Sequence, residues 1–302
     1  MGAATPPAVP WARAGAACLC AVVFACLLLP AAAQAGRHKA RAAGANAEHP
    51  AALRSSSVLI LDAGGKQVLF EKNAEAVLPI ASLTKLMTAL VVLEARQDMQ
   101  EVLAVTDADV DELKHATSRL RVGTGLRRAD LLHIALMSSE NRAASALGRN
   151  YPGGLPAFVA AMNRRAASLG MVHTHYVEPT GLSSANVSSA QDLARLVMAA
   201  QAQPVIRAYT TDHEYAIAQG RRNTLYHNSN SLVANPGWDI TLQKTGYITE
   251  AGRCMVMLAT IAGRPIVMIF LDSQGKLSRF ADAERVRSWL MAVQRTRLAA
   301  SP

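Results

Sequence analysis

Residues 57–62 read SVLILD, and the turn AGGK at residues 63–66 separates them from QVLF at residues 67–70. Two apolar runs on either side of a short glycine-containing turn are typical of a β-hairpin. Three further apolar segments that predict strands lie toward the other end of the chain: residues 240–248, 254–261 and 265–271. The order of these segments predicts one antiparallel five-stranded sheet completed by both ends of the chain.

The sequence between the two groups of predicted strands contains segments with helical periodicity. Apolar residues recur at helical spacing in two segments: Leu83, Leu86, Met87, Leu90 and Val91, then Leu131, Leu132, Ala135 and Leu136. A final amphipathic helix is expected over residues 278–294, with apolar positions spaced to pack onto the sheet. The predicted fold class is therefore α/β in the α+β sense, an antiparallel five-stranded sheet flanked by helices with a mainly helical second lobe.

The first 35 residues predict a cleaved secretory signal peptide. Arg13 precedes the apolar stretch 14–29, Pro30 ends it, and AQA at residues 33–35 forms a small-residue cleavage site. A transmembrane anchor is the alternative, but the apolar stretch is short for a bilayer. After the signal, we expect a flexible basic leader, one domain and a short tail over residues 36–54, 55–297 and 298–302. The mature chain is expected in the periplasm without a stable membrane anchor.

The chain is basic, with 31 Lys and Arg against 22 Asp and Glu and a formal net charge of +9. A basic surface outside the cytoplasm suits an anionic cell-wall polymer. Nucleic-acid binding requires a basic stripe interleaved with aromatic residues, whereas these charges are scattered and aromatics are only 5% of the chain. Three of the four cysteines lie in the predicted signal peptide, and the apolar neighbours of Cys254 predict a packed core thiol.

Ser82 and Lys85 form the first pattern with chemical meaning. They open the first strongly predicted helix, where their spacing places both side chains on one face. A serine hydroxyl is a weak nucleophile that needs a base within hydrogen-bond reach, and a lysine kept neutral by burial can supply it. The spacing alone is weak because Ser273 and Lys276 share it, but Gly275 predicts a turn for that second pair.

Ser139-Glu140-Asn141 is the second pattern, on a short polar loop between two predicted helices. A hydroxyl and an amide on such a loop can reach into one cleft, where Ser139 can relay a proton and Asn141 can hold a substrate carbonyl. A helix-capping serine is the alternative interpretation. A second match, Ser184 with Asn186, has no helix before it and ranks below the first.

Lys244-Thr245-Gly246 is the third pattern and lies at the end of a predicted strand. The glycine lets a substrate backbone approach the strand edge closely, and the lysine and threonine side chains can bind a carboxylate. The triplet occurs once and is the most specific of the three patterns. The three patterns in this order are much less probable by chance than any one of them alone.

With these motifs the chain resembles the active-site serine D-alanyl-D-alanine peptidases, the low-molecular-mass penicillin-binding proteins, whose signature is Ser-x-x-Lys, Ser-x-Asn and Lys-Thr-Gly. The similarity spans residues 57–294 and includes VEPTGL at residues 177–182, which looks like a connecting segment of these peptidases. The resemblance implies the serine β-lactamase and D-alanyl-D-alanine peptidase fold, with no cofactor and no metal. It also implies peptidoglycan stem peptides and cross-links as substrates, and β-lactams as inhibitors.

The resemblance also implies catalytic roles. Ser82 would form the acyl-enzyme, Lys85 would take its proton, and Ser139 would help carry a proton to the leaving amine. Whether Lys85 or another group acts as the base in acylation is disputed across these enzymes.

Binding roles follow from the same resemblance. Asn141 would orient the amide on the acyl side of the substrate. Lys244 and Thr245 would bind the substrate near its carboxylate. The backbone N–H groups of Ser82 and Tyr247 would form the oxyanion hole.

Three other activities compete with this interpretation. A serine β-lactamase of the commonest class needs a glutamate and an asparagine to hold a deacylating water, but Glu178 is followed four residues later by Leu182, so we expect a long-lived penicilloyl adduct. A metal-dependent wall peptidase would use His173 and His175, yet no His-Glu-x-x-His motif supplies the remaining groups. A non-catalytic wall-binding protein would be expected to lack at least one motif residue.

Within the family, we expect an endopeptidase that cuts existing cross-links, with a carboxypeptidase that trims pentapeptide stems as the alternative. The family's carboxypeptidases usually add a β-rich domain and an amphipathic membrane helix after the peptidase domain. Here 31 residues (302 minus 271) follow Leu271, and the predicted final helix uses most of them.

Overall fold

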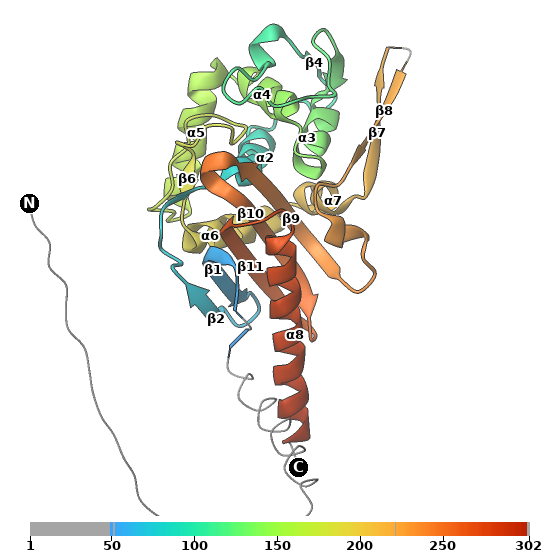
Figure 1. The fold of residues 1–302 in the computed structure, drawn as a ribbon. Coiled ribbons are helices and arrows are strands. Elements are labelled where there is room, and N and C mark those ends of the chain that lie inside the picture. Colours follow the sequence, from blue (N-terminus) through green and yellow to red (C-terminus); the bar gives the residue numbers. More distant parts are fainter. Residues whose placement is uncertain (1–48, 51, 221, 301–302) are drawn as a thin grey trace, which may run out of the picture. The chain divides into compact units, whose positions relative to one another are not determined.

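The computed structural model describes residues 49–50, 52–220 and 222–300. The predicted signal peptide and most of the predicted leader lie outside these residues. All described residues fall in one compact unit, which Figure 1 shows as a sheet with helices packed on both faces. None of its helices combines the length and the apolar character needed to cross a bilayer.

The central sheet has five antiparallel strands in the order β2-β1-β11-β10-β9. Their bounds are β1 Ser55–Asp62, β2 Gln67–Lys72, β9 Asp239–Ile248, β10 Gly252–Ile261 and β11 Arg264–Ser273. The two ends of the domain meet inside the sheet, because Ser57 of β1 pairs with Leu271 of β11. The predicted sheet is confirmed, and β9, which carries the third motif, is an edge strand.

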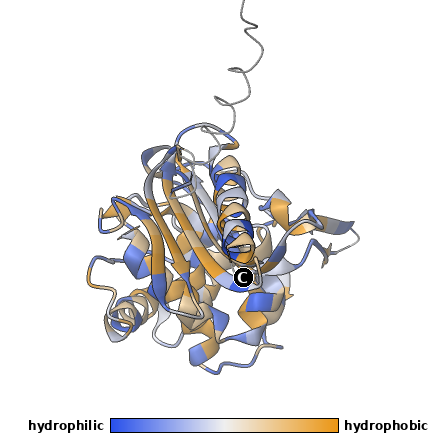
Figure 2. Ribbon diagram, turned by 90° about the horizontal axis from the view of Figure 1, so that it is seen from below, coloured by the Kyte–Doolittle hydropathy of each residue, from blue (hydrophilic) through white to orange (hydrophobic). Residues whose placement is uncertain are grey.

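Two hydrophobic clusters cover the two faces of the sheet. Alternation along β1 sends Ile60 to one cluster and Leu59 to the other. Helix α8 (Ser278–Ala299) closes the first face, with Val286 and Leu290 buried. Figure 2 shows orange segments along the strands beside α8, which carries both blue and orange residues. The predicted final helix is confirmed, although it continues beyond its expected C-terminal end.

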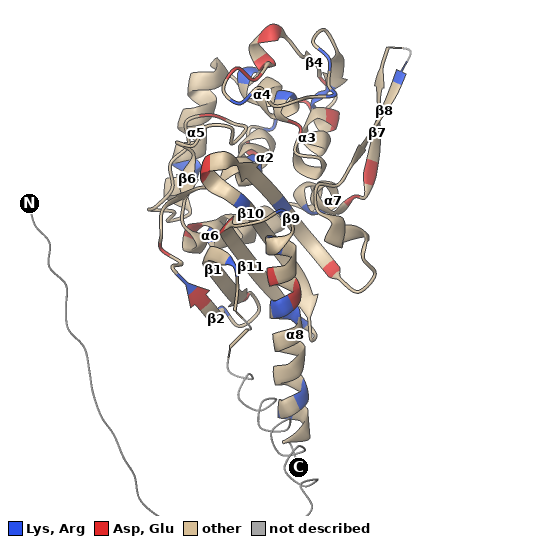
Figure 3. Ribbon diagram, viewed as in Figure 1, with Lys and Arg blue, Asp and Glu red and all other residues tan. Residues whose placement is uncertain are grey.

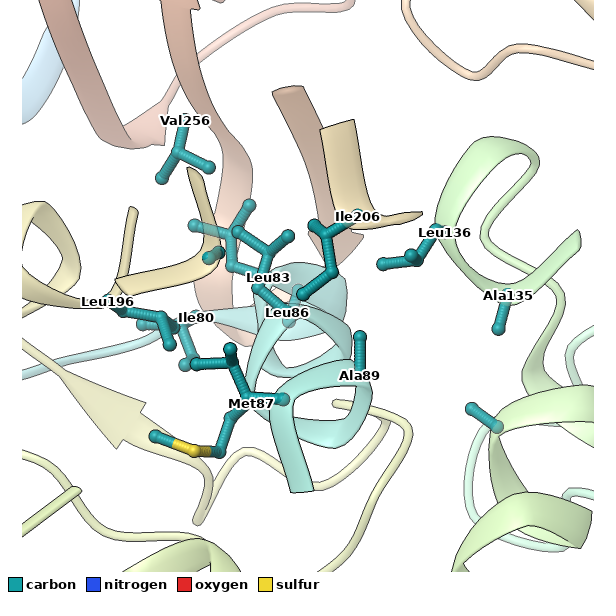
Figure 4. Packing of buried hydrophobic residues seen from close by; sticks show 14 of the residues in the cluster. Ile80, Leu83, Leu86, Met87, Ala89, Ala135, Leu136, Leu196, Ile206 and Val256 are labelled. Carbon is teal, nitrogen blue, oxygen red and sulfur yellow. The ribbon is translucent and has the colours of Figure 1, made fainter. Parts of the chain in front are cut away.

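The larger cluster joins the other face of the sheet to a group of helices around α2 (Thr84–Glu94). These helices are α3 Arg128–Met137, α4 Asn141–Arg149, α5 Gly154–Ser168, α6 Ala190–Gln201 and α7 Pro204–Thr211. All residues of α2 up to Val92 are buried. Figure 4 shows Met87 of α2 in the same cluster as Leu196 of α6 and Ile206 of α7. Because α2 is packed on every side, it holds the residues at its start rigidly.

The sequence does not predict three short two-stranded pairs. They are β3 Leu78–Pro79 with β6 Val187–Ser188, β4 Val102–Ala104 with β5 Gly125–Arg127, and β7 Glu214–Gln219 with β8 Arg222–His227. The strands of the first two pairs have only two or three residues, too few to show an alternating pattern, whereas β7 and β8 have six residues each. The first pair matters most for the site, because β3 leads the chain directly into Ser82.

Candidate active site

The first motif stands at the start of α2. Ser82 lies in the 3-10 turn η2 (Ala81–Leu83), and Lys85 is the second residue of α2. The turn runs directly into the helix and keeps both side chains on one side, so that Lys85 Nζ lies 2.9 Å from Ser82 Oγ. The backbone of Ala81 has a φ of 47°, a strained conformation for a residue other than glycine.

Three oxygen atoms surround the amine of Lys85. Nζ lies 2.9 Å from Ser82 Oγ, 2.8 Å from Asn141 Oδ1 and 2.6 Å from the carbonyl oxygen of Thr180. The oxygens of Asn141 and Thr180 can only accept hydrogen bonds, whereas the Ser82 hydroxyl can donate or accept. A neutral Lys85 therefore donates its two N–H bonds to Asn141 and Thr180. Its lone pair is left facing the Ser82 hydroxyl, as a general base requires.

The burial of Lys85 makes this neutral form more accessible than it is for a lysine in water. Its side chain is 1% exposed, and burial lowers the pKa of Lys85 to about 8, although the negative charges of Glu178 and Glu140 act in the opposite direction. A buried amine with such a pKa loses its proton much more readily than a lysine in water. The fraction of Lys85 that can accept the proton of Ser82 therefore increases as the pH rises through neutrality toward this value.

The second motif joins α3 to α4. Ser139 adopts a φ of 64° between the two helices, and the carboxylate of Glu140 caps α4 by accepting the Arg142 N–H. Asn141 is the first residue of α4, so the prediction that all three motif residues lie in the loop is wrong for Asn141. Its helical position fixes Asn141 Oδ1 against Lys85.

The third motif brings β9 against the turn that carries Ser82. A Cβ atom added to Gly246 would lie 2.9 Å from Ser82 N and 3.0 Å from the Cβ of Ala81. Glycine is therefore the residue that allows this approach. Thr245 Oγ1 donates to Ser229 Oγ at 2.7 Å, and Lys244 Nζ donates to the carbonyl oxygen of Thr245 at 2.9 Å.

A cleft of about 470 Å³ connects the three motifs. Five of the predicted site residues line it: Ser82, Ser139, Asn141, Thr245 and Tyr247. Lys85 and Lys244 lie behind this lining and are 1% and 0% exposed. The structure thus brings all seven predicted residues to one place, with the two lysines buried beneath the surface that a substrate would touch.

Arg279 of α8 also lines the cleft, and the sequence motifs do not include it. The side chain is 7% exposed, its Nη1 donates to the carbonyl oxygen of Lys276, and its Nε has no hydrogen-bond partner among the described residues. Burial, followed by the charge of Arg253, lowers the pKa of Arg279 to about 10. A basic residue in the first turn of a helix opposes the helix dipole, and this signal could have identified it.

Lys244 is a second buried basic residue on this side of the cleft. Burial, then the charges of Lys85 and Arg279, lower the pKa of Lys244 well below its ordinary value. A substrate anion bound beside them would stabilise the charged forms of both Lys244 and Arg279. The β9 side of the cleft can therefore receive a substrate carboxylate.

The segment VEPTGL at residues 177–182 forms the support behind Ser82 and Lys85. Gly181 has a φ of 83°, and a Cβ atom there would lie 2.0 Å from the carbonyl oxygen of Ala81. The neighbouring Thr180 supplies the carbonyl oxygen that Lys85 contacts. Sequence reasoning missed this function of Thr180 because any residue type has a carbonyl group.

The patterns ranked lower in the sequence lie outside the cleft. Ser273 is buried at the end of β11, and Asn186 is fully buried, where its Nδ2 donates to Thr84 Oγ1. His173 and His175 belong to no group of three His, Cys, Asp or Glu side chains that could hold a metal ion, as far as the described ranges extend.

Cys254 is buried, which confirms the predicted core thiol. The charged residues are spread over the whole domain. Figure 3 shows basic and acidic residues scattered over helices and strands rather than gathered in one stripe, consistent with the pattern in the sequence.

Comparisons with known proteins identify the family of the chain. The family model described as D-alanyl-D-alanine carboxypeptidase matches residues 44–275. The D-alanyl-D-alanine endopeptidase of Pseudomonas aeruginosa is 47% identical over 82% of this chain and 81% of its own, and that of Escherichia coli is 42% identical over 89% and 87%. The solved Streptomyces K15 DD-transpeptidase is 25% identical, with a TM-score of 0.75 over 81% of this chain and 99% of its own. The chain therefore belongs to the D-alanyl-D-alanine carboxypeptidase family and is a serine-type D-alanyl-D-alanine peptidase.

Proposed function

We propose that this chain is a D-alanyl-D-alanine endopeptidase that cleaves peptide cross-links of peptidoglycan through an acyl-enzyme on Ser82. The observation that carries the proposal is the contact set of Lys85, whose two acceptor-only neighbours leave its lone pair for the Ser82 hydroxyl. The cleft in front of Ser82, with Lys244 and Arg279 on its β9 side, supplies the binding site.

Acylation begins when Ser82 Oγ attacks the carbonyl carbon on the acyl side of the scissile amide. The hydroxyl proton passes to Lys85, and the backbone N–H groups of Ser82 and Tyr247 stabilise the negative charge that develops on the carbonyl oxygen. When the amide C–N bond breaks, a proton is delivered to the leaving amine with the help of Ser139. The result is an ester on Ser82 and a free amine.

Deacylation returns the enzyme to its starting state. A water molecule attacks the ester carbon, the Ser82 oxygen leaves and regains its proton, and a carboxylate is released. A β-lactam follows the same first step, but its ring-opened leaving group stays tethered to the acyl group. We therefore expect a long-lived penicilloyl adduct on Ser82.

The leaving half of the substrate carries a carboxylate next to the scissile amide. We place this carboxylate on the β9 side of the cleft, near Thr245 and Arg279, with Lys244 behind them. An arginine fork is well suited to a carboxylate, because it can form two parallel charge-assisted hydrogen bonds. Tyr247 lies at the same end of the cleft, with a side chain that is 53% exposed.

The preference for cross-links rather than stem ends rests on the relatives. The two most similar of those described above are named endopeptidases at 47% and 42% identity, whereas relatives named carboxypeptidases match at 31% and 28% identity. We also propose that the chain acts in the periplasm after export, which the apolar stretch 14–29 and AQA at residues 33–35 support.

Digestion of purified muropeptides tests the proposal. The mature protein is incubated separately with cross-linked dimers and with uncross-linked pentapeptide monomers, and the products are measured by mass spectrometry. We expect dimers to be converted to monomers, with no conversion by Ser82→Ala. Release of terminal D-alanine from monomers while dimers stay intact would instead identify a carboxypeptidase, and inactivity toward both would reject the proposed chemistry.

A further inference from the structure

Glu178 is the centre of a hydrogen-bond network beneath the catalytic residues. Its carboxylate accepts the N–H of Thr180 at 2.5 Å, the hydroxyl of Thr180 at 2.6 Å and the N–H of Gly181 at 2.6 Å. Asn186 Nδ2 donates at 2.9 Å and the N–H of Ser183 at 3.4 Å. One carboxylate thus fixes the path of the backbone through residues 178–183.

This backbone path ends on the catalytic base. The carbonyl oxygen of Thr180 accepts a hydrogen bond from Lys85 Nζ at 2.6 Å, and the carbonyl oxygen of Pro179 accepts one from Thr88 of the same helix at 2.7 Å. Gly181 lies so close to Ala81 that a side chain has no room there. The loop therefore touches α2 and the turn before it, on both sides of Ser82.

Buried Asn186 ties the same loop to the start of α2. Its Oδ1 accepts the N–H of Val177, and its Nδ2 donates to Glu178 and to Thr84 Oγ1. Thr84 Oγ1 in turn donates to the carbonyl oxygen of Ala81 at 2.8 Å. The loop and the serine turn are therefore one connected polar network, in which a change at Glu178 is transmitted to the base.

The position of Glu178 argues against direct catalysis. It is not among the described residues that line the cleft with Ser82, and its two oxygens are occupied by donors of its own loop. A glutamate that activates a deacylating water would need a free oxygen facing the acyl group. Glu178 therefore acts through other groups.

We propose that Glu178 is a positioning residue for acylation, whose carboxylate shapes the 178–183 loop so that the Thr180 carbonyl takes one N–H of Lys85 and the amine lone pair faces Ser82. This inference rests on the proposed function, because it assigns Glu178 a task in acylation of Ser82. Its negative charge also lies close enough to Lys85 to raise the pKa of that amine against the effect of burial. Glu178 therefore affects both the direction of the Lys85 lone pair and the pH at which Lys85 loses its proton.

The two effects are separable by substitution. Glu178→Gln removes the charge and replaces one acceptor by a donor, so we expect a lower maximal acylation rate together with a lower pKa of Lys85. Glu178→Asp keeps the charge on a shorter side chain, so we expect the lower rate with little change in the pKa. Glu112→Gln is the control, because it removes one negative charge from an exposed residue of a nearby loop.

The experiment measures the second-order rate of acylation by labelled penicillin as a function of pH, through the pKa of Lys85 at about 8. For Glu178→Gln we expect the rising part of the profile to move to lower pH by roughly one unit and the plateau rate to fall about tenfold to hundredfold. For Glu178→Asp we expect the plateau to fall without this movement. Glu112→Gln should match the wild type.

A wild-type profile for Glu178→Gln would overturn the inference. A lower plateau with an unmoved rising limb in Glu178→Gln would also overturn it, since loss of loop structure alone explains such a result. If Glu178→Gln does not fold, Glu178→Asp decides, and a wild-type plateau rate there contradicts the inference. Absence of acylation in the wild type would instead reject the proposed function, so the two failures are distinguishable.

Discussion

The cleft has two walls: the helical wall, formed by η2 and the starts of α2 and α4, and the sheet wall, formed by β9 and the start of α8. Each wall contains a buried lysine, and the two lysines have different surroundings. On the helical wall, Lys85 has three oxygen neighbours within 2.9 Å and the negative charges of Glu178 and Glu140 near it. On the sheet wall, Lys244 contacts the carbonyl oxygen of Thr245, and its pKa is lowered first by burial and then by the positive charges that Lys85 and Arg279 can carry.

This contrast corresponds to a division of work between the walls. The helical wall is satisfied without a ligand, so its hydrogen bonds can hold a base and a nucleophile in one fixed geometry. Among the described residues, no carboxylate forms an ion pair with Lys244 or Arg279, and Arg279 Nε has no partner there. In the proposed function, the carboxylate of the substrate would supply negative charge at this wall. The proposed function thus assigns acylation to the helical wall and substrate recognition to the sheet wall.

Removal of the base on the helical wall is expected to have the largest effect. Lys85→Met keeps the apolar stem of the side chain but removes the lone pair that faces Ser82. We expect acylation by penicillin to fall by roughly four to six orders of magnitude, as for loss of a nucleophile or its base. Stopped-flow acylation measures the rate, and circular dichroism of the same sample checks folding. A folded variant that acylates within about tenfold of the wild type would show that another group is the base.

Most of the fold and the helical wall's side chains could be predicted from the sequence. The apolar runs on either side of the turn at residues 63–66 and the helical periodicity around Leu86 involve residues that are close in the chain, so both can be recognised without a structure. The motif side chains of Ser82 and Lys85 are readable for the same reason, since one helical turn brings them together.

The remaining parts of the site depend on contacts between distant segments. Thr180 acts through its carbonyl oxygen, which no residue type reveals, and it lies 95 positions from Lys85. Arg279 reaches the cleft because α8 begins where β11 leaves the sheet, which is a property of the topology. From the sequence, Glu178 could be considered only as a deacylating glutamate that lacks its asparagine partner. In the structure its carboxylate accepts hydrogen bonds from the N–H groups of Thr180 and Gly181 in its own loop.

Loss of Arg279 on the sheet wall is expected to have the next largest effect. For Arg279→Ala we expect kcat/KM toward a carboxylate-bearing peptide to fall about tenfold to hundredfold, the cost of a lost charge-assisted hydrogen bond. Arg279→Lys should recover part of this, since it retains charge but not the planar fork. The decisive comparison uses a substrate whose carboxylate is replaced by a carboxamide. An equal loss with both substrates would show that Arg279 does not bind the carboxylate.

The pH dependence of acylation tests the neutral state of Lys85. A base must be unprotonated, so the rate rises with pH through the pKa of Lys85, about 8, and reaches a plateau above it. Below this value we expect about a tenfold decrease for each unit of pH. Rates are measured with labelled penicillin, and near-UV circular dichroism at each pH confirms that the protein is folded. A rate independent of pH across this range would contradict a lysine base.

The smallest effect is expected at the mouth of the cleft, where an ion pair joins the two walls. Lys114 lines the cleft and pairs with Glu250 of the turn after β9, and their side chains are 31% and 43% exposed. Exposed ion pairs have a small interaction free energy, so we expect Lys114→Gln to change kcat/KM by less than about fivefold. Glu250→Gln is the matched control for the partner. A hundredfold loss in either variant would place the pair in substrate binding, and the two walls would no longer be separable in function.

Mapping the covalent penicillin adduct tests the central claim most directly, that the helical wall activates Ser82 as the nucleophile. The protein is labelled, digested and analysed by tandem mass spectrometry, with Ser82→Ala and Ser139→Ala treated in parallel. We predict one penicilloyl group on the peptide that contains Ser82, its absence from Ser82→Ala, and its continued attachment at Ser82 in Ser139→Ala. A penicilloyl group on any other residue, or undiminished labelling of Ser82→Ala, would contradict the account.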